Sequence, residues 1–136
     1  MMPKHFPGII LISLLTFSGL SYSQLVPPSN IKVKLVDGNI VKLSWDAQSS
    51  NQKVSYNIYR AEENNSSTSI ASPKPEFKKL NSVTAPVYED KTEASPGKVF
   101  IYYVTTVNSN GVESASSNYV NVKIGETGTD QNIYTY

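Results

Sequence analysis

The side chains that enzymes use most often are nearly absent from this chain. Its 136 residues include no cysteine and a single histidine, His5. His5 lies so near the start that it falls within a segment patterned like a cleaved leader. Without histidine or cysteine in the remainder, neither a Ser-His-Asp nor a Cys-His arrangement can form. The usual zinc sites lose their ligands for the same reason.

Carboxylates are the other groups that could act, either as an acid and base pair or as calcium ligands. The pairs Glu62-Glu63 and Glu89-Asp90 are flanked by polar residues. We expect both pairs to be solvated surface charges. A carboxyl group that acts as a general acid needs a raised pKa, and a raised pKa requires burial. No Asp-x-Asp cluster offers the oxygens that calcium takes, and segment 125–128 lacks the lysine of a phosphate loop. The residues predict no enzyme, no cofactor and no metal site.

The first 23 residues have the pattern of a secretory signal peptide. Lys4 precedes the apolar stretch 9–20, and the small residues Ser21 and Ser23 stand at its exit. A membrane span needs about 20 apolar residues, and this stretch is shorter and interrupted by polar residues. We therefore predict a signal peptide over 1–23, a secreted protein (periplasm, cell surface or medium) and no membrane span after cleavage.

The charges of the remaining chain are balanced. Losing Lys4 with the leader leaves 11 of the 12 basic residues against 11 acidic ones. Arg60 is the only arginine. Nucleic-acid binding usually leaves a basic stripe rich in arginine, so we expect no nucleic-acid partner.

The mature chain alternates apolar and polar residues at the period of β-strands. Strands are predicted at 31–35, 41–45, 56–60, 77–80, 87–88, 99–107 and 119–124. Turn signals such as Asp37-Gly38 and Pro96-Gly97 separate them. Seven short strands spaced in this way are typical of an all-β, immunoglobulin-like sandwich. The polar stretch 62–75 is predicted to be a loop and 125–136 a flexible tail.

The same alternation selects one face of each strand as the core. The residues placed there are Leu43, Trp45, Tyr56, Ile58, Tyr88, Phe100, Tyr102, Val104, Val120 and Val122.

An ordered set of short motifs resembles a fibronectin type III domain of the kind common in bacterial secreted proteins. The motifs lie at 27–28, 43–45, 56–60, 88–90, 96–98, 104–108 and 110–114. The resemblance implies a domain over 24–124, two sheets, and Trp45 at the centre of the core. It also implies a binding or spacing role, as in adhesins, surface proteins and polysaccharide-degrading enzymes. One departure is Phe100, which stands where the family has the tyrosine of the tyrosine corner.

Strand parity also places a group of residues on the outside of one sheet. These candidate binding residues are Tyr59, Ile101, Tyr103 and Tyr119. Tyrosine is enriched at recognition surfaces, so one interpretation is a docking face for a protein or a glycan. The other interpretation is cross-strand aromatic pairing that only stabilises the sheet.

Two segments offer further possibilities. Asn64 and Asn65 begin overlapping glycosylation sequons in the 62–75 loop. Segment 132–136 has the composition to add as a strand to a neighbouring copy. The functional prediction is a secreted, non-catalytic interaction module with an unidentified protein or glycan partner. The alternatives are a self-assembling structural subunit and a glycan-binding accessory to a separate polysaccharide hydrolase.

Overall fold

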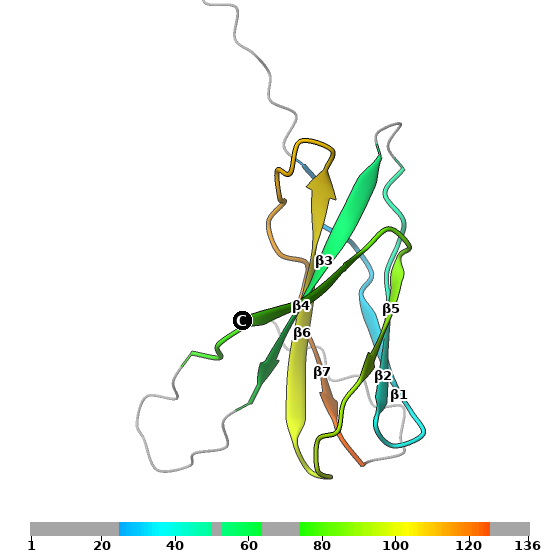
Figure 1. Ribbon diagram of the computed structural model, residues 1–136, viewed down its shortest axis with the longest axis vertical. Helices are drawn as coiled ribbons and strands as arrows, with labels where there is room; N and C mark the ends of the chain where they lie inside the picture. Colours follow the sequence, from blue (N-terminus) through cyan, green and yellow to red (C-terminus); the bar gives the residue numbers. More distant parts are fainter. Residues whose placement is uncertain (1–24, 50–52, 64–73, 126–136) are drawn as a thin grey trace, which may run out of the picture.

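The structure is a computed structural model that describes residues 25–49, 53–63 and 74–125. These residues form two antiparallel sheets that pack face to face (Figure 1). The seven strands are β1 (Lys32–Val36), β2 (Ile40–Ser44), β3 (Val54–Glu62), β4 (Lys78–Val83), β5 (Val87–Lys91), β6 (Val99–Asn108) and β7 (Val120–Lys123). The predicted signal peptide, the two sequons and nearly all of the predicted tail lie outside the described residues.

One sheet has three strands in the order β1-β2-β5, and the other has four in the order β4-β3-β6-β7. The hairpin between β1 and β2 turns at Asp37 and Gly38, whose φ angles are 52° and 76°. Positive φ at both central positions suits the twist of a tight hairpin. The predicted all-β sandwich of seven strands is confirmed.

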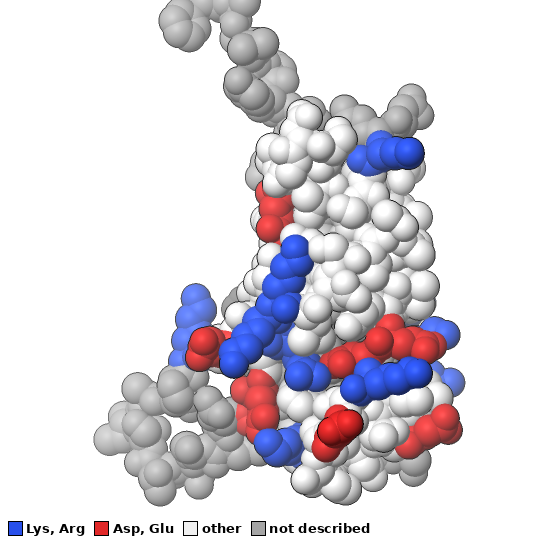
Figure 2. All heavy atoms as spheres, in the orientation of Figure 1, with Lys and Arg blue, Asp and Glu red and all other residues white. Residues whose placement is uncertain are grey.

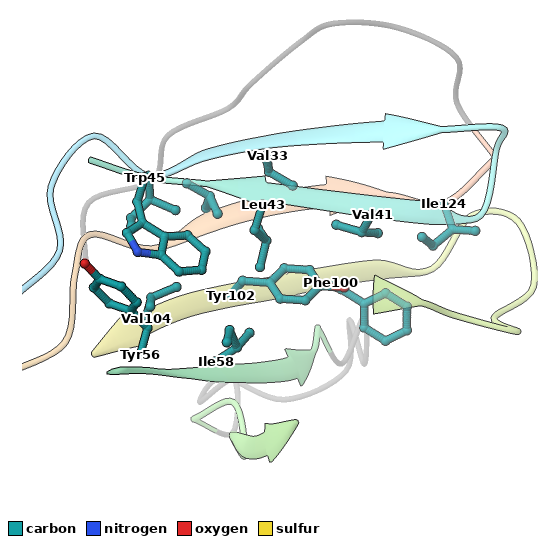
Figure 3. Packing of buried hydrophobic residues seen from close by; sticks show 12 residues of the cluster. Val33, Val41, Leu43, Trp45, Tyr56, Ile58, Phe100, Tyr102, Val104 and Ile124 are labelled. Carbon is teal, nitrogen blue, oxygen red and sulfur yellow. The ribbon is translucent and has the colours of Figure 1, made fainter. Parts of the chain in front are cut away.

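The core fills the space between the sheets (Figure 3). Leu43, Ile58, Tyr102 and Val104 are completely buried. Trp45 meets Tyr56 edge to face at 5.3 Å at one end of this layer. The other predicted core residues also lie there, with Tyr88 and Val122 only partly buried against the cluster.

The segment before β7 is joined to β6 partly through serine side chains. Segment 111–119 runs beside β6, and its only regular bridge is that of Val107 with Glu113. The Val104 N–H donates to Ser117 Oγ at 3.0 Å, and the Thr106 N–H donates to Ser114 Oγ at 2.9 Å. These hydroxyls satisfy buried amides of β6 that a regular strand would have satisfied with carbonyls.

Asp90 corrects the expectation that the Glu89-Asp90 pair is solvated. Its register partner is Val41, which faces the core, and Asp90 exposes only 7% of its surface. Arg60 Nη1 lies 2.7 Å from Asp90 Oδ2, and the buried Tyr102 hydroxyl donates to the same oxygen at 2.8 Å. The predicted surface charge is therefore an ionic contact between the two sheets. Glu89 does lie on the surface, 3.4 Å from Lys42.

Candidate binding face

The outer face of the four-stranded sheet carries a row of aromatic rings. Tyr59 on β3 lies opposite Tyr103 on β6 in the antiparallel register. Their rings stack with centroids 4.6 Å apart and planes inclined by 13°. Strand alternation places both rings on the side away from the core, as the sequence predicted for these two residues.

Tyr119 and Phe77 complete the group. Tyr103 is the central ring: Phe77 meets it at 4.8 Å and 62°, and Tyr119 at 5.4 Å and 70°. Phe77 and Tyr119 also touch each other, at 5.5 Å. We call Tyr59, Phe77, Tyr103 and Tyr119 the aromatic cluster; all four are half-buried.

Phe77 was expected within a short strand and was not assigned to the binding face. It directly precedes β4, so strand alternation places it on the same side as Lys79, whose register partner is Tyr59. The alternation can be recognised in the sequence. The register that places β4 beside β3 cannot, so the contacts of Phe77 with Tyr103 and Tyr119 were not predictable.

Ile101 does not fit the prediction that it is an exposed member of this face. It exposes only 3% of its surface, and its register partners are Ala61 and Asn121. A side chain buried to this extent offers no contact area to a partner. Ile101 therefore supports the sheet rather than forming part of a binding surface.

A polar row runs beside the aromatic cluster. Asn57 on β3 pairs in register with Ser82 on β4 and with Thr105 on β6. Asn57 is buried, with 6% exposed, and its Oδ1 accepts a hydrogen bond from Ser82 Oγ at 2.6 Å. Buried polar groups must find partners, so this contact fixes the orientation of the Asn57 amide.

Glu113 links the polar row to the rings. The Tyr59 hydroxyl donates to Glu113 Oε1 at 2.8 Å, and the Thr105 hydroxyl donates to the same oxygen. We call Asn57, Ser82, Thr105 and Glu113 the polar row. The bridge between Val107 and Glu113 holds the backbone of Glu113 beside β6.

These contacts set the ionisation of the face. Partial burial alone would raise the pKa of Glu113, but hydrogen bonds from Thr105, Tyr59 and Asn57, together with the charge of Lys79, outweigh it and lower that pKa. Burial, together with the hydrogen bond to Glu113, raises the pKa of Tyr59 to about 12. At neutral pH Glu113 is therefore an ionised acceptor and Tyr59 a neutral donor.

The molecule carries no large region of one charge on the face that Figure 2 shows. Basic and acidic side chains alternate across its lower half, while its upper half carries few charges (Figure 2). Among the described residues, opposite charges are joined in the ion pairs of Lys42 with Glu89, Arg60 with Asp90, and Lys98 with Glu62.

A cavity of about 290 Å³ lies elsewhere, at the end of β3 and the start of β6. Its lining is mixed in charge and includes Arg60, Glu62, Lys78 and Phe100. The Arg60 guanidinium lies 4.5 Å from the centroid of the Phe100 ring. None of the rings of the aromatic cluster lines this cavity.

Within residues 25–49, 53–63 and 74–125, no three acidic or metal-binding side chains gather closely enough to hold a metal ion. The same residues contain no helix of the length and apolarity that crossing a membrane requires.

Solved structures similar to this one include fibronectin type III modules. An Fn3-like protein from Clostridium thermocellum is 26% identical, with a TM-score of 0.53, and the match covers 71% of this chain and 90% of that one. The third fibronectin III domain of the human KIAA0343 protein is 21% identical, with a TM-score of 0.59, covering 76% and 84%. The domain of human fibronectin type III domain containing protein 3 is 22% identical, with a TM-score of 0.56, covering 75% and 87%. No protein-family model and no curated protein matches the sequence.

These likenesses define the class of protein. The chain has a fibronectin type III-like fold, as its motifs predicted, and that fold is a common, generally non-catalytic interaction module. A fold alone never specifies a partner, so the function must be argued from the aromatic cluster and the polar row.

Proposed function

We propose that the mature chain is an exported, non-catalytic interaction module that binds a protein or glycan outside the cytoplasm through the outer face of its four-stranded sheet. The aromatic cluster is the observation that supports this proposal. Four rings contributed by β3, β6 and the segments before β4 and β7 touch one another on one side of a sheet. Tyrosine and phenylalanine supply large contact area at low entropic cost.

The rigidity of the site favours recognition. Each ring of the cluster is held by at least two others or by a hydrogen bond, so little freedom is lost when a partner binds. Mutual stacking also stabilises the sheet by about 0.5–1.5 kcal/mol for each pair. The stabilising interpretation of the tyrosines therefore accounts for the ring contacts. It does not account for the ionised Glu113 that two hydroxyls orient beside them.

The edge strands favour binding through the face over self-assembly through the edges. β4 carries Lys78 and Lys79, and β5 carries Glu89 and Lys91, all of them exposed. Charged residues on edge strands oppose pairing with another chain. We therefore do not favour a structural subunit assembled by strand addition.

The test is binding of the purified mature protein to envelope and surface material from the cells that produce it. Wild type is expected to bind saturably, and Tyr59→Ala and Tyr119→Ala to bind much more weakly. Glu89→Gln, which changes a charge on the opposite sheet, serves as the control and is expected to bind like wild type. The proposal fails if the tyrosine variants, folded by circular dichroism, bind as well as the control.

A further inference from the structure

The polar row indicates what chemistry the partner of this face has. Building on the proposed function, we propose that the face binds a neutral polysaccharide. The rings of the aromatic cluster pack against the C–H faces of its sugars, and Glu113 accepts hydrogen bonds from its hydroxyl groups.

The ring geometry supplies the apolar half of such a site. Aromatic ring faces are electron-rich and attract the weakly positive hydrogens of C–H bonds. The cluster extends across the sheet from Tyr59 through Tyr103 to Tyr119, with Phe77 touching the last two. A row of rings across neighbouring strands suits an extended chain of repeating sugars better than a single small molecule.

Glu113 supplies the polar half. Both Tyr59 and Thr105 donate to Oε1, and the carboxylate itself lies on an exposed residue that a ligand can reach. An ionised carboxylate only accepts hydrogen bonds, and a sugar hydroxyl can donate one. The hydroxyls of Tyr59 and Thr105 hold the carboxylate in place before the ligand arrives, which lowers the cost of binding.

The charge of the face matches an uncharged ligand. Glu113 and Lys79, the register partner of Tyr59, are both exposed at this face and carry opposite charges. A polyanion would meet no excess of positive charge. A protein partner would bury the ionised Glu113 at an interface, where charged groups are normally depleted. A polysaccharide leaves water within reach of the carboxylate.

The experiment is native gel electrophoresis of the mature protein in gels containing single polysaccharides. The neutral probes are mixed-linkage β-glucan, xyloglucan, galactomannan and soluble starch, with polygalacturonate as the anionic probe; sedimentation with cellulose and chitin covers insoluble ligands. At least one neutral probe is expected to retain the protein, and polygalacturonate is expected to have no effect. Tyr59→Ala and Tyr119→Ala are each expected to weaken binding about tenfold, as loss of one aromatic contact should.

Glu113→Gln tests the polar half, because the amide keeps the shape of the side chain and loses the ionised acceptor. It is expected to weaken binding several-fold, whereas Glu89→Gln on the opposite sheet leaves binding unchanged. Retention by none of the neutral probes overturns the inference, as does equal retention of Glu113→Gln and wild type.

Treating the envelope material with periodate or with protease shows whether the ligand in it is a polysaccharide or a protein. Binding abolished by periodate and resistant to protease is expected for a polysaccharide. Binding abolished by protease and resistant to periodate overturns the polysaccharide inference. If that binding is still lost in the tyrosine variants, the proposed interaction face stands, because only its ligand class was wrong.

Discussion

Asp90→Ala should destabilise this domain, because Asp90 is an acceptor that two side chains of the other sheet share. Asp90 on β5 receives Arg60 from β3 and the hydroxyl of Tyr102 from β6, so it joins the two sheets. The side chains of Arg60 and Asp90 expose 27% and 10% of their surface. Alanine removes the shared acceptor and leaves both partners facing the core.

The magnitude follows from the burial of each partner. Tyr102 is fully buried, and a buried donor left unsatisfied costs about 1–3 kcal/mol. Arg60 reaches solvent, so losing its partner costs about 1 kcal/mol, well below the value for a fully buried pair. The free energy of unfolding should therefore fall by about 2–4 kcal/mol.

Trp45 provides the assay, because it is the only tryptophan and is buried in the core. Its fluorescence should report urea unfolding. With a slope of about 1–1.5 kcal/mol per molar urea, Asp90→Ala should lower the midpoint by about 2 M. Glu89→Ala removes only an exposed ion pair worth about 0.5 kcal/mol. Equal midpoints for the two variants would refute the inter-sheet role of Asp90.

Three further predictions use other contacts. Ser117→Ala should lower the free energy of unfolding by about 1–3 kcal/mol in the same assay, because the buried Val104 N–H loses its acceptor. Phe100→Tyr should be neutral or stabilising by up to about 1 kcal/mol, since it restores the hydroxyl of the tyrosine corner. Tyr59 should ionise near pH 12 by NMR titration of its ring, and Glu113→Gln should move that pKa toward the ordinary value of 10.0. Because the pKa of Tyr59 is higher in the folded state, its contribution to stability is complete below pH 10 and is lost between pH 10 and 12.

Each of these has its own control. Ser116→Ala changes an exposed neighbour of Ser117, and a similar loss in both variants would contradict the role of the Ser117 hydroxyl. A clear loss of stability in Phe100→Tyr would mean that β6 is aligned wrongly with the family pattern. A Tyr59 pKa that does not respond to Glu113→Gln would contradict the hydrogen bond between them.

The strands were predictable because each depends on local alternation. Apolar residues such as Leu43, Ile58 and Val104 belong to patterns that repeat every second residue. This pattern decides which face of each strand is buried. Trp45 and Tyr102 lie in the core for the same reason. The contacts of segment 111–119 with β6 were not predictable, because Ser114 and Ser117 accept hydrogen bonds from β6 amides through their side chains.

Tyr59, Tyr103 and Tyr119 could be assigned to one outer face from parity alone. Glu113 could not, because it comes from an irregular segment whose position depends on its bridge to Val107. The role of Asp90 was missed because its polar neighbours suggested an exposed side chain. Asp90 lies two residues after Tyr88, so strand alternation places both side chains on the inward face.

The sequence by itself determined the class of fold and the inward and outward sides of the strands, because alternation is a property of consecutive residues. The tertiary structure alone decided which residues meet across strands and sheets. Phe77 joins the tyrosines, and Asp90 joins Arg60, through pairings between segments far apart in the chain. Local periodicity contains no information about such register, so the composition of the binding face became apparent only once the sheets were assembled.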